Sequence, residues 1–245
     1  MRPVNKKSNS NWIYGHHAVT AALQNPNRKN ILIKMTKDCQ FDKALAQKTP
    51  IQIVSRQEID SLFNAGVVHQ GIALQTSPLP PVSIEDIIEK TESEEKTVIL
   101  MLDQVTDPHN IGALLRSSAA FGAAAVILSD AGAPEENNST MAKSACGGLE
   151  IVPLVRVSNL ARTIERLQKA GFWVLGLDGY AKKLINEDTL PAKTVFVLGS
   201  EGDGMRRLTA EKCDYLIKLP ISENMESLNV SNAGAIALYE FYRQK

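Results

Sequence analysis

Two stretches near the end of the 245-residue chain combine residue types that could form a binding site. The apolar runs 195–198 and 215–219 each lead into an irregular segment rich in Gly, Ser, Asn and Glu. If both runs are strands, these segments leave the sheet at strand ends, where open α/β sheets bind their ligands. The first segment, GSEGDG, lacks the GxGxxG spacing of a dinucleotide fingerprint and the Lys-Ser/Thr pair of a P-loop. Taken alone, it could equally be an ordinary turn.

The second segment places alternating polar residues in front of a helix. In SLNVS, residues 227–231, an extended backbone would put Ser227, Asn229 and Ser231 on one face. The next residues predict a helix over 232–243, capped by Ser231 or by the residue after it. Small residues begin this helix, so another main chain or a ligand can approach it closely.

A third candidate lies upstream, directly after the apolar run 97–102. The segment DPHNIGALLR ends with Arg116, and Asn110 within it is placed to cap a helix. The neighbours of Arg116 at three and four positions on that helix are all small: Gly112, Ala113, Ala119 and Ala120. Such an arginine can lie along a ligand or a closely approaching chain. An isolated arginine would more simply pair with a carboxylate.

Six apolar runs of strand length alternate with helical segments in the second part of the chain. They are residues 97–102, 125–129, 151–155, 172–177, 194–198 and 215–219. Val/Ile/Leu-rich runs separated by helices are typical of a mostly parallel sheet that is covered on both faces. The clearest helix is 158–170, with Ser158 as its cap and Gly171 as its stop. The sequence therefore predicts an α/β fold.

A smaller α/β unit is predicted upstream of this sheet. Its expected helices are 16–24, 38–48 and a capping-box helix from Ser55 to about Asn64, and its expected strands are 31–35, 51–54 and 72–76. SPLPPVS, residues 77–83, is the best linker because its three prolines favour an extended backbone. The predicted organisation is a domain over 1–79, a linker with an acidic helix over 80–96, and a second domain over 97–245.

Charge is distributed unevenly, although the chain as a whole is neutral. Residues 1–79 carry ten basic and four acidic side chains, whereas the remainder carries 17 basic and 23 acidic ones. This asymmetry indicates an anionic partner for the first domain, with Arg28 and Lys29 as expected phosphate contacts. A solvated basic surface is the alternative that charge alone leaves open.

Cysteine usage and hydropathy exclude several other classes of protein. Cys39, Cys146 and Cys213 lie far apart without a CxxC pattern, so buried free thiols in a reducing cytoplasm are expected rather than a zinc site. No metal site is indicated. No apolar run approaches the length of a membrane span, and the first residues lack the apolar core of a signal peptide.

Taken in their order along the chain, the segments DPHNIGALLR, GSEGDG and SLNVS resemble the three motifs of the SpoU (TrmH-type) branch of the SPOUT RNA methyltransferases. The stretches WIYGHHAVTAAL and VVHQGIAL are similar to the small substrate-binding domain of the RlmB group in this family. The resemblance implies transfer of a methyl group from S-adenosyl-L-methionine to a ribose 2′-hydroxyl of RNA, most specifically a guanosine of 23S ribosomal RNA. It also implies a C-terminal trefoil knot, which general topology rules would disfavour, and a homodimer. Candidate interface residues are Tyr239, Phe241 and Tyr242, which could equally belong to the core.

The resemblance assigns roles to specific positions of this chain. The implied catalytic residues are Arg116, Asn110, Glu201, Ser227 and Asn229; the implied cofactor contacts are Gly199, Leu219 and Leu228. The cofactor contacts carry no polar side chain, which fits binding through the main chain. We favour Arg116 as an anchor for the phosphate of the reacting nucleotide, because an arginine with a pKa above about 12 is a reluctant base.

Three other functions stay open at this point. An NAD-dependent oxidoreductase would use a similar sheet, but the fingerprint after the first strand is missing. A non-catalytic RNA-binding or ribosome-assembly protein could keep the fold, although the motif residues speak for an enzyme. A transfer-RNA ribose methyltransferase is the alternative that the sequence separates least well. The segment ISENMES is more acidic than the family resemblance leads one to expect, and could alter the substrate-facing surface.

Overall fold

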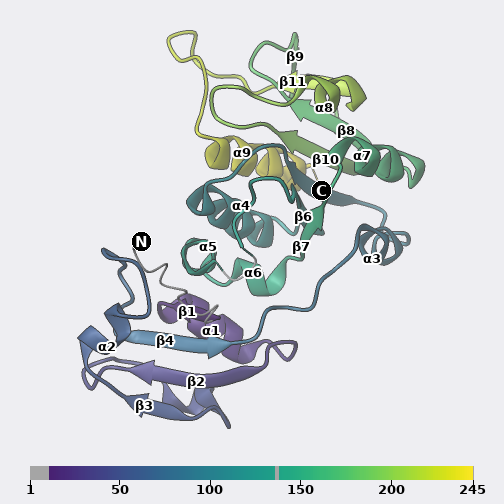
Figure 1. Ribbon diagram of the computed structural model, residues 1–245. Coiled ribbons are helices and arrows are strands. Elements are labelled where there is room, and N and C mark those ends of the chain that lie inside the picture. Colours follow the sequence, from purple (N-terminus) through teal and green to yellow (C-terminus); the bar gives the residue numbers. More distant parts are fainter. Residues whose placement is uncertain (1–10, 136–137, 245) are drawn as a thin grey trace, which may run out of the picture.

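The apolar runs of the second domain form one seven-stranded sheet, in which every neighbouring pair of strands is parallel. The computed structural model describes residues 11–135 and 138–244 (Figure 1). The strand order is β7-β6-β5-β10-β8-β11-β9. The strands are β5 (Thr97–Leu102), β6 (Ala125–Ser129), β7 (Leu154–Val157), β8 (Trp173–Leu177), β9 (Lys183–Leu184), β10 (Lys193–Leu198) and β11 (Tyr215–Lys218). The predicted mostly parallel α/β fold is confirmed.

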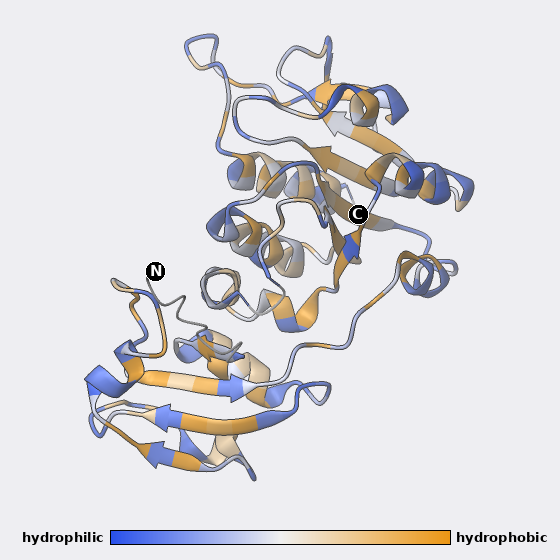
Figure 2. Ribbon diagram, viewed as in Figure 1, coloured by the Kyte–Doolittle hydropathy of each residue, from blue (hydrophilic) through white to orange (hydrophobic). Residues whose placement is uncertain are grey.

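Helices cover both faces of this sheet, whose strands are largely hydrophobic along their length (Figure 2). Leu100 belongs to a core with α4 (Pro108–Ala120) and α9 (Val230–Arg243), whereas its neighbour Ile99 belongs to a core with α3 (Ile84–Lys90) and α7 (Leu160–Lys169). Successive side chains of a strand point to opposite faces, so one apolar run supplies both cores. The remaining helices here are α5 (Ser139–Ala145), α6 (Gly148–Ile151) and α8 (Arg207–Lys212).

The first domain is a four-stranded sheet of order β1-β4-β2-β3. Its elements are β1 (Trp12–Tyr14), α1 (His16–Gln24), β2 (Asn30–Met35), the 3₁₀ turn η1 (Lys43–Ala46), β3 (Ile51–Ile53), α2 (Arg56–Asp60) and β4 (Ile72–Thr76). Only β2 and β3 pair in parallel. The predicted capping box of Ser55 and Glu58 is present, and a second one of Ser83 and Asp86 begins α3.

Some predicted elements differ from those observed. The helix expected over 38–48 is wrong, because only η1 forms there, opened by the Asp42 side chain and closed by Gln47 at φ 50°. The strand expected at 151–155 begins at Leu154, since the preceding residues form α6. The cap of α7 is Asn159 rather than Ser158. Strands β1 and β9 were not predicted; they have only three and two residues.

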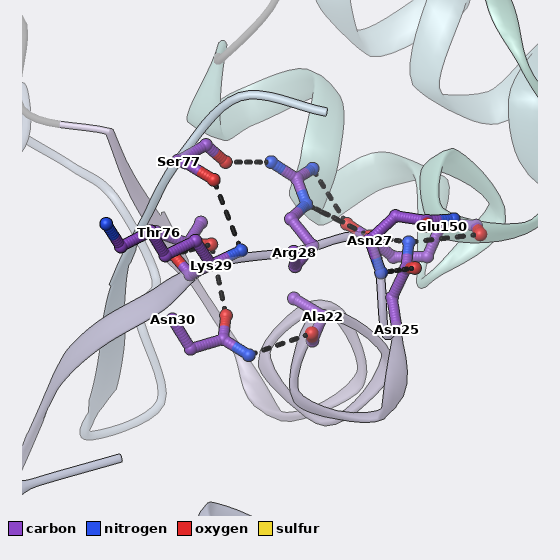
Figure 3. A network of polar contacts seen from close by, with 9 residues as sticks. All are labelled: Ala22, Asn25, Asn27, Arg28, Lys29, Asn30, Thr76, Ser77 and Glu150. Atoms are coloured by element: carbon purple, nitrogen blue, oxygen red, sulfur yellow. Dashed lines mark hydrogen bonds and ion pairs between the residues drawn. The ribbon is translucent and has the colours of Figure 1, made fainter. Parts of the chain in front are cut away.

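A buried ion pair joins the two domains (Figure 3). The guanidinium of Arg28, in the first domain, donates from Nε and Nη2 to Glu150 of α6 at 2.8–3.1 Å. Its Nη1 donates to the carbonyl of Ser77 at the start of the linker, and Asn25 Nδ2 donates to the same carboxylate at 2.7 Å. The two charged side chains are only 2% and 6% exposed. The expectation that Arg28 contacts RNA phosphate is therefore wrong, because its charge is enclosed within the protein.

Helix α5 is the second link between the domains. Lys143 Nζ donates to Gln70 Oε1, and a Cβ at Gly147 would lie 2.9 Å from the methyl of Ala21 in α1. Apolar side chains of both domains, such as Val19 and Ala145, belong to one continuous core. The first domain thus packs directly onto the helices that lie beside α4.

Candidate functional site

One residue from each of the three motif segments meets in a hydrogen-bonded cluster around Glu201. Its Oε1 accepts from Asn110 Nδ2 at 3.1 Å, from Asn229 Nδ2 at 2.6 Å and from the amide of Val230 at 3.3 Å. Asn229 Nδ2 also lies 3.1 Å from Asn110 Oδ1. A carboxylate that accepts three hydrogen bonds at the N-terminus of α9 is also favoured by the helix dipole.

Two helix starts position the asparagines of this cluster. Asp107 caps α4 by accepting from the amide of His109, so Asn110 lies inside the first turn and does not cap, contrary to the prediction. Asn229 is the cap of α9, in place of the predicted Ser231 or Asn232. Its Oδ1 accepts from the amide and hydroxyl of Ser231, which leaves Nδ2 to donate to Glu201. The alternation of polar residues predicted a shared face for Ser227, Asn229 and Ser231, but it did not predict that Asn229 is the cap of α9.

The loop that carries Glu201 is folded tightly back on itself. Ser200 and Gly204 exchange main-chain hydrogen bonds of 3.0 and 3.1 Å. A Cβ at Gly199 would lie 2.0 Å from the carbonyl carbon of Gly204, so only glycine fits there. This close contact between two main-chain segments accounts for the presence of glycine at position 199 without any ligand.

Asp103 is a site residue that the sequence reasoning missed. It follows β5 and is fully buried, and it accepts from Arg206 Nε at 2.7 Å and from the Arg206 amide at 2.9 Å. A buried carboxylate needs such partners to offset its lost hydration. The pair attaches the end of the Glu201 loop to the end of the neighbouring strand. An acidic residue directly after an apolar strand was the available signal.

Arg116 lies on α4 outside the Glu201 cluster. Its side chain is exposed, and Nη1 lies 3.5 Å from Sγ of Cys146, which caps α5 in the left-handed conformation at φ 48°. The small residues near Arg116 serve helix packing, since a Cβ at Gly112 would lie 2.5 Å from the carbonyl oxygen of Met141 in α5. The patch thus accommodates a neighbouring helix, which is one of the two roles expected for it.

Comparison with known proteins extends over both domains. The pattern of the SpoU rRNA Methylase family matches residues 97–239, and that of the RNA 2′-O ribose methyltransferase substrate-binding domain matches residues 12–82. A 23S rRNA (guanosine-2′-O-)-methyltransferase RlmB from Pseudomonas putida is 42% identical, over 95% of this chain and 96% of its own length. The chain belongs to the SpoU methyltransferase family. RlmB from Salmonella typhi is 41% identical over 96% of this chain and 99% of its own.

Solved SpoU structures share the fold. The SpoU methyltransferase AviRb from Streptomyces viridochromogenes, in complex with AdoMet, aligns with a TM-score of 0.81 at 20% identity, over 95% of this chain and 89% of its own. An RNA methyltransferase of the TrmH family from Porphyromonas gingivalis aligns with a TM-score of 0.73 at 22% identity, over 96% and 90% of the two chains. The family resemblance of the sequence is confirmed. The trefoil knot that it implies stays a prediction.

The remaining candidate positions of this SpoU chain lie on loops at one edge of the sheet. Gly199 follows β10, Leu219 follows β11, and Ser227 and Leu228 precede α9. Leu219 and Leu228 are partly exposed, and their main-chain groups make no main-chain hydrogen bond to another described residue. The loop after β8 also reaches this edge, because a Cβ at Gly179 would lie 3.6 Å from the carbonyl oxygen of Glu226.

The cysteines are free, as predicted, but partly exposed rather than buried. Burial, together with the nearby charges of Asp214 and Asp103, raises the pKa of Cys213 to about 12, which keeps this thiol protonated at neutral pH. Among residues 11–135 and 138–244, no group of three or more His, Cys, Asp or Glu side chains is arranged to hold a metal ion. In the same part of the chain, no helix has the length and apolar character needed to cross a membrane.

Proposed function

We propose that this chain methylates the ribose 2′-hydroxyl of a guanosine in 23S ribosomal RNA, using S-adenosyl-L-methionine. In this proposal residues 1–79 bind RNA, residues 80–96 connect the domains, and residues 97–245 carry out the transfer. The observation that carries the proposal is the cluster of Asn110, Glu201 and Asn229, in a chain that is similar to RlmB enzymes over nearly its whole length.

The loops at the carboxyl ends of β10 and β11 fit the cofactor. Partly exposed Leu219 and Leu228 offer apolar surface to an adenine ring. Their main-chain groups, which have no hydrogen-bond partner among the described residues, can hydrogen-bond its edge. When bound, S-adenosyl-L-methionine supplies the methyl group. The Glu201 cluster holds the first loop against the start of α9, so Gly199 keeps its position when the cofactor enters.

The exposed guanidinium of Arg116 suits the RNA phosphate. Its fork can bind the phosphate of the reacting nucleotide in a bidentate manner, and its positive charge favours loss of the 2′-hydroxyl proton. Among the described residues, only Cys146 contacts the guanidinium, at Nη1, so the other donors are available to the phosphate. Asn110 and Asn229 orient Glu201, and we assign Ser227, on the adjacent exposed loop, to contact with the ribose.

Transfer of a tritiated methyl group to defined RNA transcripts tests this function. Unmethylated 23S ribosomal RNA should be labelled, and nuclease digestion should release the label as 2′-O-methylguanosine. Unmethylated 16S ribosomal RNA and transfer RNA, at equal concentration, serve as controls. Labelling of transfer RNA in preference to 23S RNA would contradict the substrate. RNA binding without any labelling would indicate a non-catalytic protein.

We further propose a cytoplasmic homodimer that uses the exposed side of α9. Tyr239 and Tyr242 are 52% and 46% exposed and lie with their rings 5.8 Å from that of Phe121. Phe241, in contrast, is fully buried and belongs to the core. Clustered exposed aromatic residues are typical of the anchors of protein interfaces.

Replacing Tyr239 with glutamate should convert the dimer to a monomer. A charge placed among aromatic rings would have to lose its hydration when the interface forms. Sedimentation equilibrium would measure the change, with Tyr180→Glu as the control because Tyr180 is 97% exposed and belongs to the loop after β8 rather than to α9. A monomeric wild-type protein, or a dimer unaffected by Tyr239→Glu, would contradict the proposed interface.

A further inference from the structure

A cavity of about 550 Å³ opens in the first domain, at the end of its sheet that lies beside α5. All four strands contribute: residues after β1, β2 and β3 line it, together with those that precede β4. The volume is within the range of sites that enclose a small molecule, about 300–1,000 Å³. None of the three motif segments contributes to it.

The lining of the cavity contains two positively charged side chains that can bind a ligand. Lys37 and Arg56 are exposed, and neither forms a salt bridge among the residues that the structure describes. Asp38 is the one acidic residue in the lining. The hydroxyl of Thr36 and a main-chain amide hold the pKa of its carboxyl below the usual range, with a smaller contribution from Arg56. Asp38 therefore has partners on its own segment, and the cavity suits an anionic ligand.

Gln70 is held at the rim in a conformation that glutamine rarely adopts. Its φ is 59°, and Gly71 follows at φ 77°. Fully buried His69 supports this turn: its Nδ1 accepts from the amide of Gly71 at 3.0 Å, so Nε2 carries the proton and donates to Asp60 Oδ1 at 3.0 Å. Left-handed backbone is unfavourable for a non-glycine residue, and such strain concentrates at functional positions.

The side-chain amide of Gln70 has a defined orientation. Oε1 accepts from the amide of His16 at 3.2 Å and from Nζ of Lys143. Within the described part of the chain, its Nε2 has no hydrogen-bond partner, so it is available to donate to a ligand. Lys143 belongs to α5, whose cap Cys146 contacts Arg116. A series of contacts thus leads from Gln70 at the rim, through α5, to Arg116 on α4.

We propose that this cavity binds one unpaired nucleotide of the RNA substrate, with its phosphate at Lys37 and Arg56 and a base edge at the Gln70 amide. The inference rests on the proposed RNA methyltransferase function. Proteins read RNA sequence mainly through unstacked bases, which stack on planar side chains and offer their edges to hydrogen bonds. His16 supplies a planar group in the lining. The cavity would therefore recognise a nucleotide at a fixed distance from the one that is methylated.

Affinity for unmethylated 23S ribosomal RNA, measured by filter binding at several salt concentrations, tests the phosphate contacts. The double variant Lys37→Ala/Arg56→Ala should bind at least about tenfold more weakly, with a log–log salt slope smaller by about 0.7, because it removes the contacts to one phosphate and each single-strand phosphate contact adds about 0.7. The matched control is Lys43→Ala/Lys48→Ala, which removes the same charge from exposed positions of the same domain outside the cavity. Equal losses in both double variants would overturn the proposal.

The Gln70 contact is tested by steady-state kinetics. Gln70→Glu replaces the donor with an acceptor, and should raise the KM for 23S RNA about tenfold without lowering kcat at saturating RNA. Gln47→Glu is the matched control, because Gln47 is also exposed and left-handed (φ 50°) in the same domain. A KM for Gln70→Glu equal to that of the control would overturn the base contact.

The activity of the wild-type protein and competition by a free nucleotide distinguish failure of the proposed function from failure of the cavity assignment. If wild-type protein transfers no methyl group to 23S RNA, the proposed function fails, whatever the cavity variants do. If the wild type is active but the cavity variants match their controls, the cavity assignment fails alone. Guanosine monophosphate should not compete with the RNA at millimolar concentration; competition that Lys37→Ala/Arg56→Ala abolishes would reveal a free-nucleotide site and overturn the RNA assignment.

Discussion

Arg116→Ala should reduce kcat for methyl transfer by at least about 100-fold while leaving the affinity for S-adenosyl-L-methionine within a few-fold of wild type. Removal of one charged donor at a reacting centre commonly costs about 10²–10³ in rate. The cofactor loops lie at the ends of β10 and β11, and Arg116 makes no hydrogen bond to the Glu201 cluster among the described residues. Transfer would be measured with tritiated cofactor on 23S RNA, and cofactor affinity by calorimetry.

Two further variants distinguish a specific role of Arg116 from loss of a positive charge. Arg116→Lys should also be poor, because an ammonium cannot reproduce the planar fork. Arg162→Ala is the control, since Arg162 is exposed on α7 at the other face of the sheet and should leave kcat unchanged. Loss of cofactor affinity in step with activity would show that Arg116 acts on the cofactor instead.

Breaking the Arg28–Glu150 pair should cost about 3–5 kcal/mol of the free energy of unfolding. Arg28→Ala would leave the carboxylate of Glu150, whose side chain is only 6% exposed, without its cation, and an uncompensated buried charge carries a cost of this size. Urea denaturation would measure the loss. Lys29→Ala is the control, because its side chain is exposed one residue further on and its removal should change stability by less than about 0.5 kcal/mol.

A double variant tests whether the loss of stability in Arg28→Ala comes from the unpaired charge of Glu150. Arg28→Met/Glu150→Met removes both charges and should be clearly more stable than Arg28→Ala, since buried pairs can often be replaced by apolar residues at little cost. A loss below about 1 kcal/mol for Arg28→Ala would mean that the pair is hydrated in solution, and that the domains do not stay packed as in Figure 3.

The large sheet was predictable because its strands are continuous apolar runs, which burial on both faces requires. Local patterns failed where only a few residues decide the structure. Residues 38–48 have helix-compatible residues, but starting a helix is costly and Gln47 turns left-handed, so one 3₁₀ turn forms. Two-residue β9 exists only because its neighbour β11 is already in place, and no local signal marks it.

The site was predictable to the extent that its residues belong to ordered motifs. Asn110 and Glu201 lie 91 residues apart, and only the motif order indicated that they would meet. Arg28 shows the limit of such reasoning. A count of charges in a sequence carries no information on burial, and its partner Glu150 lies 122 residues away in the other domain. Gln70 was not predicted for a similar reason: its left-handed backbone depends on the contact of buried His69 with Gly71, and a sequence carries no information on such burial.

Reverse transcription at low nucleotide concentration, on ribosomal RNA from a strain that lacks this protein, tests the methyltransferase function most directly. A 2′-O-methyl group arrests the polymerase, so a stop at one guanosine of 23S RNA should be present in the parent and absent in the deletion strain. Wild-type protein should restore the stop, and Arg116→Ala should not. An unchanged pattern of stops in 23S RNA, or loss of a stop in transfer RNA instead, would contradict the proposed function.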